Sequence, residues 1–365
     1  MIPDNRLPYS IPARVCLCAA LATLLFLASG GCAGRAPAER VEFTRVCMGV
    51  EARLVFFASR PDEATATAGE VFALLAGLDA AMSDYRTDSE LNRLSDAAGG
   101  PPTGISPDLF DVLNAARDIA RASDGAYDPT VGPCVTLWRA SRRITTLPAP
   151  AQRAAAVSLV NWRDLHLDPA ARTASLARPG MRLDLGGIAK GYAADRAVRE
   201  LRRRGYNRCL VSLAGDIAAG DAPPGKPGWL VTVESCDPAS PTGSIRLANA
   251  AVSTSGGCEQ FVEIDGVRYA HIVDPRTGLG SPRTCTVTVI APRGEQADAL
   301  STAAFLLGPV AAGEALRAVP GAAAVFTDPA SGPPSVTIIG DGRALRWSTP
   351  PIATVPPAGP PPNSH

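Results

Sequence analysis

The sequence predicts an α+β protein with mixed, largely antiparallel sheets and helices packed against them. Its 365 residues are 46% hydrophobic, which is enough for one large domain with a substantial core. Short runs rich in β-branched residues are mixed with longer amphipathic runs, without the regular strand–helix repeat of a parallel sheet. Its 34 glycines and 34 prolines supply many turns between these elements.

The first residues have the layout of an export signal. Arg6 and Arg14 precede an apolar run of 14 residues, Val15–Ala28, and the small residues 29–31 lead to Cys32. The run is shorter than the roughly 20 residues that span a bilayer, as in a secretory signal peptide. A cysteine directly after small residues resembles a bacterial lipoprotein signal, in which that cysteine carries the lipid. An ordinary cleaved signal and an uncleaved anchor are the alternatives.

We therefore divide the chain into a lipoprotein-type signal peptide at 1–31, a tether at 32–41, a domain at 42–347 and a tail at 348–365. The tail, STPPIATVPPAGPPPNSH, is proline-rich, and we expect it to be disordered. The expected location is outside the bacterial cytoplasm, anchored by lipid to the periplasmic side of the inner membrane.

The elements of the domain follow in order. Residues 42–58 are rich in β-branched and aromatic residues and predict a strand pair or one long bent strand. Residues 62–82 have helical spacing of apolar side chains. A serine–proline pair, typical of a helix start, predicts a helix over 106–123. Another helix is expected over 187–204, ending at Gly205.

The second half of the domain contains the strongest strand pattern, TCTVTVIA at 284–291. Helices are predicted after it at 295–308 and 309–318. Short strands are expected at 181–185, 208–214, 229–234, 251–254, 260–264, 268–273, 322–327 and 335–340.

Composition excludes several function classes. The 35 basic and 35 acidic side chains cancel, so binding of nucleic acid through phosphate neutralisation is not expected. The three histidines, His166, His271 and His365, are too few and too scattered for a multi-histidine metal site. The nine cysteines contain no CxxC pair, which disfavours zinc ribbons and thioredoxin-like motifs.

A glycine turn at residues 183–191, LDLGGIAKG, is one candidate ligand loop. A predicted strand ends there and a helix begins, and the free N–H groups of a helix start suit phosphate. Lys190, one of only two lysines, would add a positive charge. The segment matches neither GxGxxG nor GxxxxGK[ST], so an ordinary strand-to-helix turn remains the alternative.

Three further segments carry polar groups. Asp298 and Thr302 are four residues apart on a predicted helix, so the carboxylate and the hydroxyl share one face and could bind magnesium. The alternative interpretation is an exposed acidic residue near a helix start, where the helix dipole favours negative charge. His271 precedes the turn DPRTG and could transfer protons, or simply pack at a sheet edge. The loop DGAYDPT at 124–130 can be explained as a helix-capping loop.

Taken in series, these segments resemble the ApbE family of flavin transferases, over about residues 46–307. The segments that carry the resemblance are Met48-Gly49, MSDYRTDSELNRLS (82–95), DGAYDPTVGP (124–133), LDLGGIAKGYAAD (183–195), LAGDI (213–217), STSGG (253–257), YAHIVDPRTG (269–278) and ADALSTA (297–303).

The resemblance implies a single large T-fold-related domain and a magnesium-dependent FAD:protein FMN transferase. Such enzymes move FMN from FAD to a threonine or serine hydroxyl of a partner protein, as a phosphoester, and release AMP. Their partners include exported or membrane redox subunits of Nqr and Rnf type. A magnesium-dependent FAD pyrophosphatase and a non-catalytic flavin-binding lipoprotein are the alternatives that we keep.

The resemblance also implies roles for individual residues. His271, Asp298 and Lys190 are the expected catalytic residues, with His271 preferred as proton acceptor because a carboxylate on a metal is a poor base. The expected metal ligands are Gly187 through its carbonyl, Asp298, Ser301 and Thr302. The expected FAD-binding residues are Met48, Tyr85, Ala126, Tyr127, Asp128, Asp184, Lys190, His271 and Ile272.

The chain departs from the family pattern at two places. Ala214 stands where the family generally has glycine, which alters how closely the backbone can approach a ligand. Gly257 and Cys258 stand where the family often has a polar and then an aromatic residue, which affects one wall of the expected site. Neither change involves a proposed metal ligand.

Overall fold

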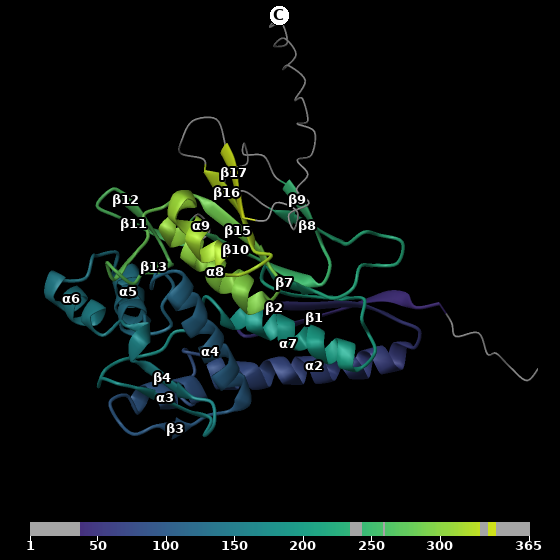
Figure 1. Ribbon diagram of the computed structural model, residues 1–365, viewed down its shortest axis with the longest axis horizontal. Coiled ribbons are helices and arrows are strands. Elements are labelled where there is room, and N and C mark those ends of the chain that lie inside the picture. Colours follow the sequence, from purple (N-terminus) through teal and green to yellow (C-terminus); the bar gives the residue numbers. More distant parts are fainter. Residues whose placement is uncertain (1–36, 234–242, 258–259, 329–334, 341–365) are drawn as a thin grey trace, which may run out of the picture.

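The computed structural model describes residues 37–233, 243–257, 260–328 and 335–340. The expected signal peptide, Cys32 and the tail at 348–365 lie outside these residues. The described chain folds around an eight-stranded sheet in the order β1-β2-β6-β7-β10-β15-β16-β17, and its neighbouring strands are antiparallel (Figure 1). The predicted α+β class with largely antiparallel pairing is therefore confirmed.

The elements have the following bounds. The strands of the large sheet are β1 (Glu39–Cys47), β2 (Val50–Ala58), β6 (Cys209–Leu213), β7 (Asp216–Ala219), β10 (Ala250–Gly256), β15 (Thr286–Ala291), β16 (Ala323–Asp328) and β17 (Ser335–Gly340). The helices are α2 (Pro61–Met82), α3 (Glu90–Asp96), α4 (Pro107–Ala122), α5 (Gly132–Ile144), α6 (Pro150–Ser158), α7 (Ala189–Arg203), α8 (Gly294–Leu307) and α9 (Pro309–Arg317). Smaller sheets join β3 (Thr103–Gly104), β5 (Thr173–Leu176) and β4 (Leu165–Asp168); β8 (Trp229–Val233) and β9 (Gly243–Leu247); β11 (Phe261–Ile264) and β12 (Val267–Ala270); and β13 (Val273–Asp274) and β14 (Leu279–Gly280).

The first two strands form a hairpin, which settles the alternative left open by the sequence. Met48 and Gly49 form its two-residue turn with φ angles of 53° and 73°, the conformation that lets two twisted strands pair directly. The pairing begins with Glu39 opposite Ala58. The expected tether at 32–41 was therefore too long at its end, because residues 39–41 already belong to β1.

The large sheet buries both of its faces, and alternation along β2 shows how. Leu54 and Phe56 point to one face and belong to the main hydrophobic core, which the helices complete. Val55 points to the opposite face and packs in a second cluster with Trp229 of β8. A strand with apolar residues on both sides is what such a central position requires.

The predicted helices are present with small shifts at their ends. Ser106 caps α4 as expected, since its hydroxyl accepts a hydrogen bond of 3.3 Å from the backbone N–H of Leu109. By length and composition α2 could cross a membrane, but residues such as Val71, Phe72 and Leu75 are buried in the main core. We therefore interpret α2 as a core helix.

One predicted strand is not formed, and several elements were not predicted. Residues 181–185 make only an isolated bridge, between Arg182 and Val131. Their backbone instead bonds to helix α3 and to a loop: Leu183 N donates to Ser95 Oγ at 3.0 Å, and Asp184 N donates to the Pro129 carbonyl at 2.8 Å. The unpredicted helices include α3, α5 and α6, and the unpredicted strands include β4, β5, β7 and β9.

Candidate functional site

The glycine turn and the late helix meet, as the site hypothesis requires. Helices α7 and α8 pack against each other (Figure 1). At Gly191 and Gly294 they approach so closely that a Cβ on Gly191 would collide with the Gly294 carbonyl. One turn earlier, a Cβ on Gly187 would lie 2.8 Å from Thr302 Oγ1. The backbone of the turn therefore lies directly against the side-chain face of α8.

Asp298 lies at the centre of this contact. Its side chain is buried, and one carboxylate oxygen accepts a hydrogen bond of 3.0 Å from the Gly191 N–H. Burial raises the pKa of Asp298 to about 7; the negative charge of Asp216 also raises it, while Lys190 lowers it. The sequence alternative, an exposed acid at a helix start, is wrong because α8 is covered by α7 and by the sheet.

Lys190 is held by a partner that we did not single out from the sequence. Its ammonium is hydrogen-bonded to Asp216 at the start of β7, and Ser253 of β10 donates to the other oxygen of Asp216. Burial alone would lower the pKa of Lys190, but the charges of Asp298 and Asp216 outweigh it and raise the pKa. Lys190 is therefore a fixed positive charge beside Asp298.

Hydroxyl groups connect this pair to the metal-ligand candidates. Ser301 Oγ donates to the Asp298 carbonyl at 2.9 Å and lies 2.8 Å from Ser255 Oγ and 3.3 Å from Ser253 Oγ. Ser255 Oγ is also 3.4 Å from Thr302 Oγ1. The hydroxyl of Ser301 is thus engaged between α8 and β10, which favours Asp298, Thr302 and the Gly187 carbonyl over Ser301 as ion ligands.

In the loop at 124–130, the side chain of Asp128 is fully engaged in hydrogen bonds within the protein, whereas the hydroxyl of Tyr127 is not. Asp128 accepts hydrogen bonds from Thr130 and, at 2.9 Å, from Trp162 N, so its carboxylate ties the loop together as a capping loop would. Tyr127 is different, because its hydroxyl is buried and has no hydrogen-bond partner among the described residues. Burial, followed by the charges of Asp298, Asp184 and Asp128, raises its pKa. A buried donor without a partner, close to these three carboxylates, suits a site that receives a polar ligand.

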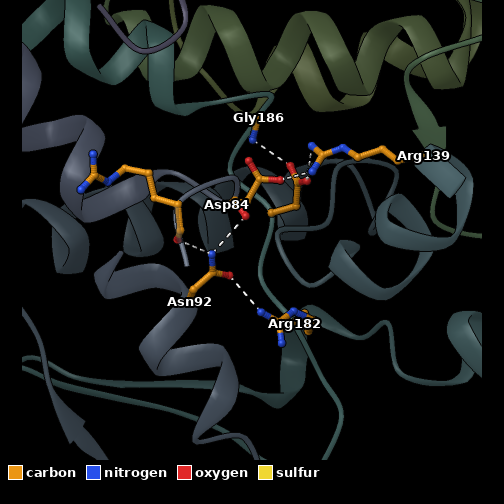
Figure 2. A network of polar contacts seen from close by, with 7 residues as sticks. Asp84, Asn92, Arg139, Arg182 and Gly186 are labelled. Atoms are coloured by element: carbon orange, nitrogen blue, oxygen red, sulfur yellow. Dashed lines mark hydrogen bonds and ion pairs between the residues drawn. The ribbon is translucent and has the colours of Figure 1, made fainter. Parts of the chain in front are cut away.

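Asp184 belongs to a polar network with Arg139 of α5 and Asp84, the last two of which are labelled in Figure 2. Asp184 accepts a hydrogen bond from Gly186 N at 2.8 Å, and Arg139 pairs with both Asp184 and Asp84. Burial, followed by the Asp84 charge, raises the pKa of Asp184, while Arg139 lowers it. Tyr85 is 77% exposed and stands over the same Arg139 guanidinium.

His271 follows β12 and remains accessible to solvent. Its Nδ1 lies 3.3 Å from the Gln260 carbonyl. Partial burial, followed by the charges of Arg142 and Lys190, lowers the pKa of His271 below 6.5, although the Gln260 carbonyl opposes this. His271 is therefore neutral near pH 7 and able to accept a proton. Ile272 is half-buried and packs against the main core.

Met48 and Ala126 make no side-chain hydrogen bond to the other candidate residues, since both side chains are apolar. Met48 lines a cleft of about 340 Å³ between the β1–β2 turn and α2, together with Phe72 and Asp79. Neither Tyr85 nor Lys190 lines this cleft. Ala126 is buried, and its backbone N–H bonds to the Ser123 carbonyl at 3.0 Å.

The donor set suits a hard cation that brings further ligands of its own. Among the described residues, no three His, Cys, Asp or Glu side chains come together to hold a metal ion. Asp298, Thr302 and the Gly187 carbonyl supply hard oxygen donors, and magnesium is commonly held by one or two carboxylates plus substrate phosphates. The residues therefore fit magnesium bound together with a phosphate ligand.

The departures from the family pattern are partly accounted for. Ala214 adopts a left-handed φ of 48° in the turn between β6 and β7, which is unusual for alanine and explains why glycine suits this position. A Cβ on Gly257 would collide with the Arg283 carbonyl, so glycine is needed there. Cys258 lies outside the described residues.

Sequence reasoning missed Asp84, Arg139, Asp216, Ser253 and Ser255 as site residues. Asp216 and the two serines stand inside motifs that were already marked, LAGDI and STSGG. Their polar side chains in otherwise apolar strands were the available signal. Arg139 offered none, because it is one of many arginines and its partners are distant in the sequence.

The chain is similar to several known proteins. Residues 48–326 match the model of the ApbE family. The chain is 35% identical over 319 residues to the FAD:protein FMN transferase of Treponema pallidum, covering 82% of this chain and 88% of that one. It is 34% identical over 252 residues to the FAD:protein FMN transferase of Haemophilus influenzae, covering 66% and 72%.

Solved structures give the same result. The flavin transferase ApbE from Vibrio cholerae superposes with a TM-score of 0.76 and 26% identity, covering 85% of this chain and all of that one. The apo form of the Pseudomonas stutzeri flavinyl transferase ApbE gives a TM-score of 0.73 and 29% identity, with coverage of 83% and 95%.

Proposed function

The chain belongs to the ApbE family, and from this premise we propose that it is an FAD:protein FMN transferase. It takes FMN from FAD, joins it through its phosphate to a threonine or serine hydroxyl of another protein, and releases AMP. The observation that carries the proposal is the meeting of Gly187, Lys190, Asp298 and Thr302 beside the unpartnered hydroxyl of Tyr127.

The chemistry of the transfer matches these groups. Attack on a pyrophosphate phosphorus places negative charge on the phosphate oxygens, and the fixed ammonium of Lys190 offsets it. Asp298, Thr302 and the Gly187 carbonyl would hold a magnesium ion, which supplies further positive charge at the phosphates. Tyr127 has a free hydroxyl to donate to a substrate oxygen.

His271 is the proposed proton acceptor. The attacking hydroxyl must lose its proton as the phosphoester forms, and a neutral imidazole can take it. The lowered pKa of His271 favours the neutral ring, and its accessibility to solvent allows a protein hydroxyl to reach it. Asp298 is less suited, because the same carboxylate is needed for the cation.

We also propose where the enzyme works and on what. The order of basic, apolar and small residues before Cys32 supports export and lipid anchoring at the periplasmic side of the inner membrane. An acceptor there would be an exported or membrane redox subunit, for which Nqr and Rnf subunits are the proposed types.

The test combines the purified protein with FAD, with and without magnesium, and with an acceptor domain that carries the target hydroxyl. If the protein is a transferase, one AMP is released for each flavin bound covalently to the acceptor, and both products require magnesium. AMP with free FMN and an unlabelled acceptor would instead establish a pyrophosphatase. FAD binding without any AMP would leave only a flavin-binding protein.

A further inference from the structure

Tyr85 presents a large aromatic ring to solvent, which is unusual for a tyrosine in a well-packed region. It is 77% exposed, although it lies in the short connection between α2 and α3. Exposed aromatic rings that are held in place commonly mark binding surfaces. Two neighbouring side chains, Asn92 and Arg139, hold this segment and its ring.

The backbone on either side of Tyr85 is pinned by Asn92 of α3. The Asn92 amide donates to the Asp84 carbonyl at 3.0 Å and to the Arg86 carbonyl at 2.8 Å. Its own oxygen accepts a hydrogen bond of 3.0 Å from Arg182, as Figure 2 shows. The flanking carbonyls of Tyr85 are thus fixed, but these bonds do not reach the ring itself.

Arg139 of α5 supplies the contact with the ring. Its guanidinium carbon lies 4.2 Å from the centroid of Tyr85, within the range of a cation–π interaction. Because one face of the ring is covered by this cation while the side chain stays largely exposed, the opposite face is open to a planar partner.

The guanidinium is itself held by two carboxylates. It pairs with Asp84, the residue directly before Tyr85 in the sequence (Figure 2). It also pairs with Asp184 of the glycine turn at 3.4 Å. The side chain of Arg139 is 31% exposed, and those of Asp84 and Asp184 are 16% and 10% exposed. A planar guanidinium can bind two carboxylates at its edge and stack on a ring with its face, which lysine cannot do.

We propose that Arg139 is a positioning residue that holds the Tyr85 ring for stacking against the flavin ring of FAD. This rests on the proposed function, because the chemistry of the open face alone requires only a planar aromatic ligand. Arg139 acts through Tyr85, and through Asp184 it ties the flavin end of the site to the turn that carries Gly187 and Lys190.

The experiment measures FAD affinity, flavin fluorescence and turnover of Arg139→Gln, Tyr85→Ala and the double variant. We expect each single variant to weaken FAD binding about tenfold, the scale of one aromatic stacking contact, with kcat at saturating FAD within about twofold of the unchanged protein. The quenching of flavin fluorescence by the stacked ring should be lost in all three. The double variant should bind no worse than Tyr85→Ala, because both changes remove one contact.

Two further variants separate positioning from stability. Arg139→Lys keeps a cation but not the planar fork, and should restore FAD affinity only in part. Arg143→Gln changes an exposed arginine of the same helix and should leave FAD affinity unchanged. Thermal melting identifies any variant that fails to fold, and the lysine variant then carries the test.

The outcomes are distinct from those of the proposed function. If the unchanged protein binds no FAD, the proposed function fails. If it binds FAD, and Arg139→Gln binds it with unchanged affinity and quenching, the positioning role is overturned. Losses that add in the double variant, or a loss confined to kcat, would also overturn it.

Discussion

At the scale of single residues, the site depends on charges that the protein places in contact away from water. The half-buried Lys190 pairs with the buried Asp216, and its charge acts on the buried Asp298. Burial raises the pKa of Asp298 to about 7, so its carboxylate is costly to ionise. A bound cation would remove that cost.

The raised pKa of Asp298 leads to a prediction of how magnesium affects the stability of the fold. A carboxyl whose native pKa lies above its ordinary 3.8 holds a proton that the unfolded chain releases, so stability falls as pH rises from about 4 to about 7. Magnesium binds the ionised form and should raise Tm more at pH 8 than at pH 5.5. Thermal melts should show no such shift in Asp298→Asn and an unchanged shift in the exposed control Asp118→Asn. An equal magnesium effect in Asp298→Asn would contradict the ligand assignment.

His271 gives a prediction on rate and pH. His271→Ala should lower transfer about 10²- to 10⁴-fold, the usual contribution of a general base. Since the Arg142 charge lowers the pKa of His271, Arg142→Gln should raise that pKa and move the acidic limb of kcat/KM to higher pH. The exposed neighbour Arg143→Gln serves as control. Full transfer by His271→Ala would exclude His271 as the base.

At the scale of elements, α7 and α8 are also joined through the carboxyl groups of Asp195 and Glu295. Asp195 of α7 accepts a hydrogen bond of 2.6 Å from Gly294 N and contacts Glu295 of α8. Burial, followed by hydrogen bonding to Glu295 and its charge, raises the pKa of Asp195 to about 8. One oxygen of Glu295 is buried and has no hydrogen-bond partner among the described residues. The proton that Asp195 retains can therefore be shared with that oxygen through a hydrogen bond.

This pair predicts a pH-dependent stability of the helix contact. Its shared proton stabilises the native state at low pH, and that stability is lost as pH rises from about 4 to about 8. Glu295→Gln supplies a permanent donor to Asp195 and should stabilise the protein by about 1 kcal/mol at pH 8, and by much less at pH 5.5. Urea unfolding at both pH values measures this, with exposed Glu314→Gln as control. A change independent of pH would refute the shared proton.

At the scale of the whole molecule, the proposed function gives the described domain and the amino-terminal segment separate tasks. The fold assembles the site from the glycine turn, α5, α8 and strands of the large sheet. In that proposal, the amino-terminal segment determines only where the site works. Anchoring and activity should therefore be separable.

Cys32→Ser tests this separation. The variant should lose incorporation of labelled fatty acid and move from the membrane fraction to the soluble periplasmic fraction, while the purified protein transfers FMN to a soluble acceptor at an unchanged rate. Cys18→Ser, inside the expected signal peptide, is the matched control and should leave the mature protein anchored. Continued lipid incorporation in Cys32→Ser would place the anchor elsewhere.

The sequence by itself determined the elements whose local signals agree with their final environment. Periodicity placed α2 and α8, the Ser106 cap placed α4, and β-branched runs placed β2, β6 and β15. It also marked Lys190, Asp298, Thr302 and His271, because rare or regularly spaced polar residues stand out within short motifs.

Only the tertiary structure decided which of these residues meet and what surrounds them. Asp216 lies 26 positions from Lys190, and Arg139 lies 55 from Asp84, so no local pattern could pair them. The segment 181–185 has the residue pattern of a strand, yet its backbone bonds to α3 and to the loop at Pro129, which the fold brings beside it. Burial sets the charge state of Asp298 and leaves the Tyr127 hydroxyl without a partner, and burial is a property of packing between distant elements.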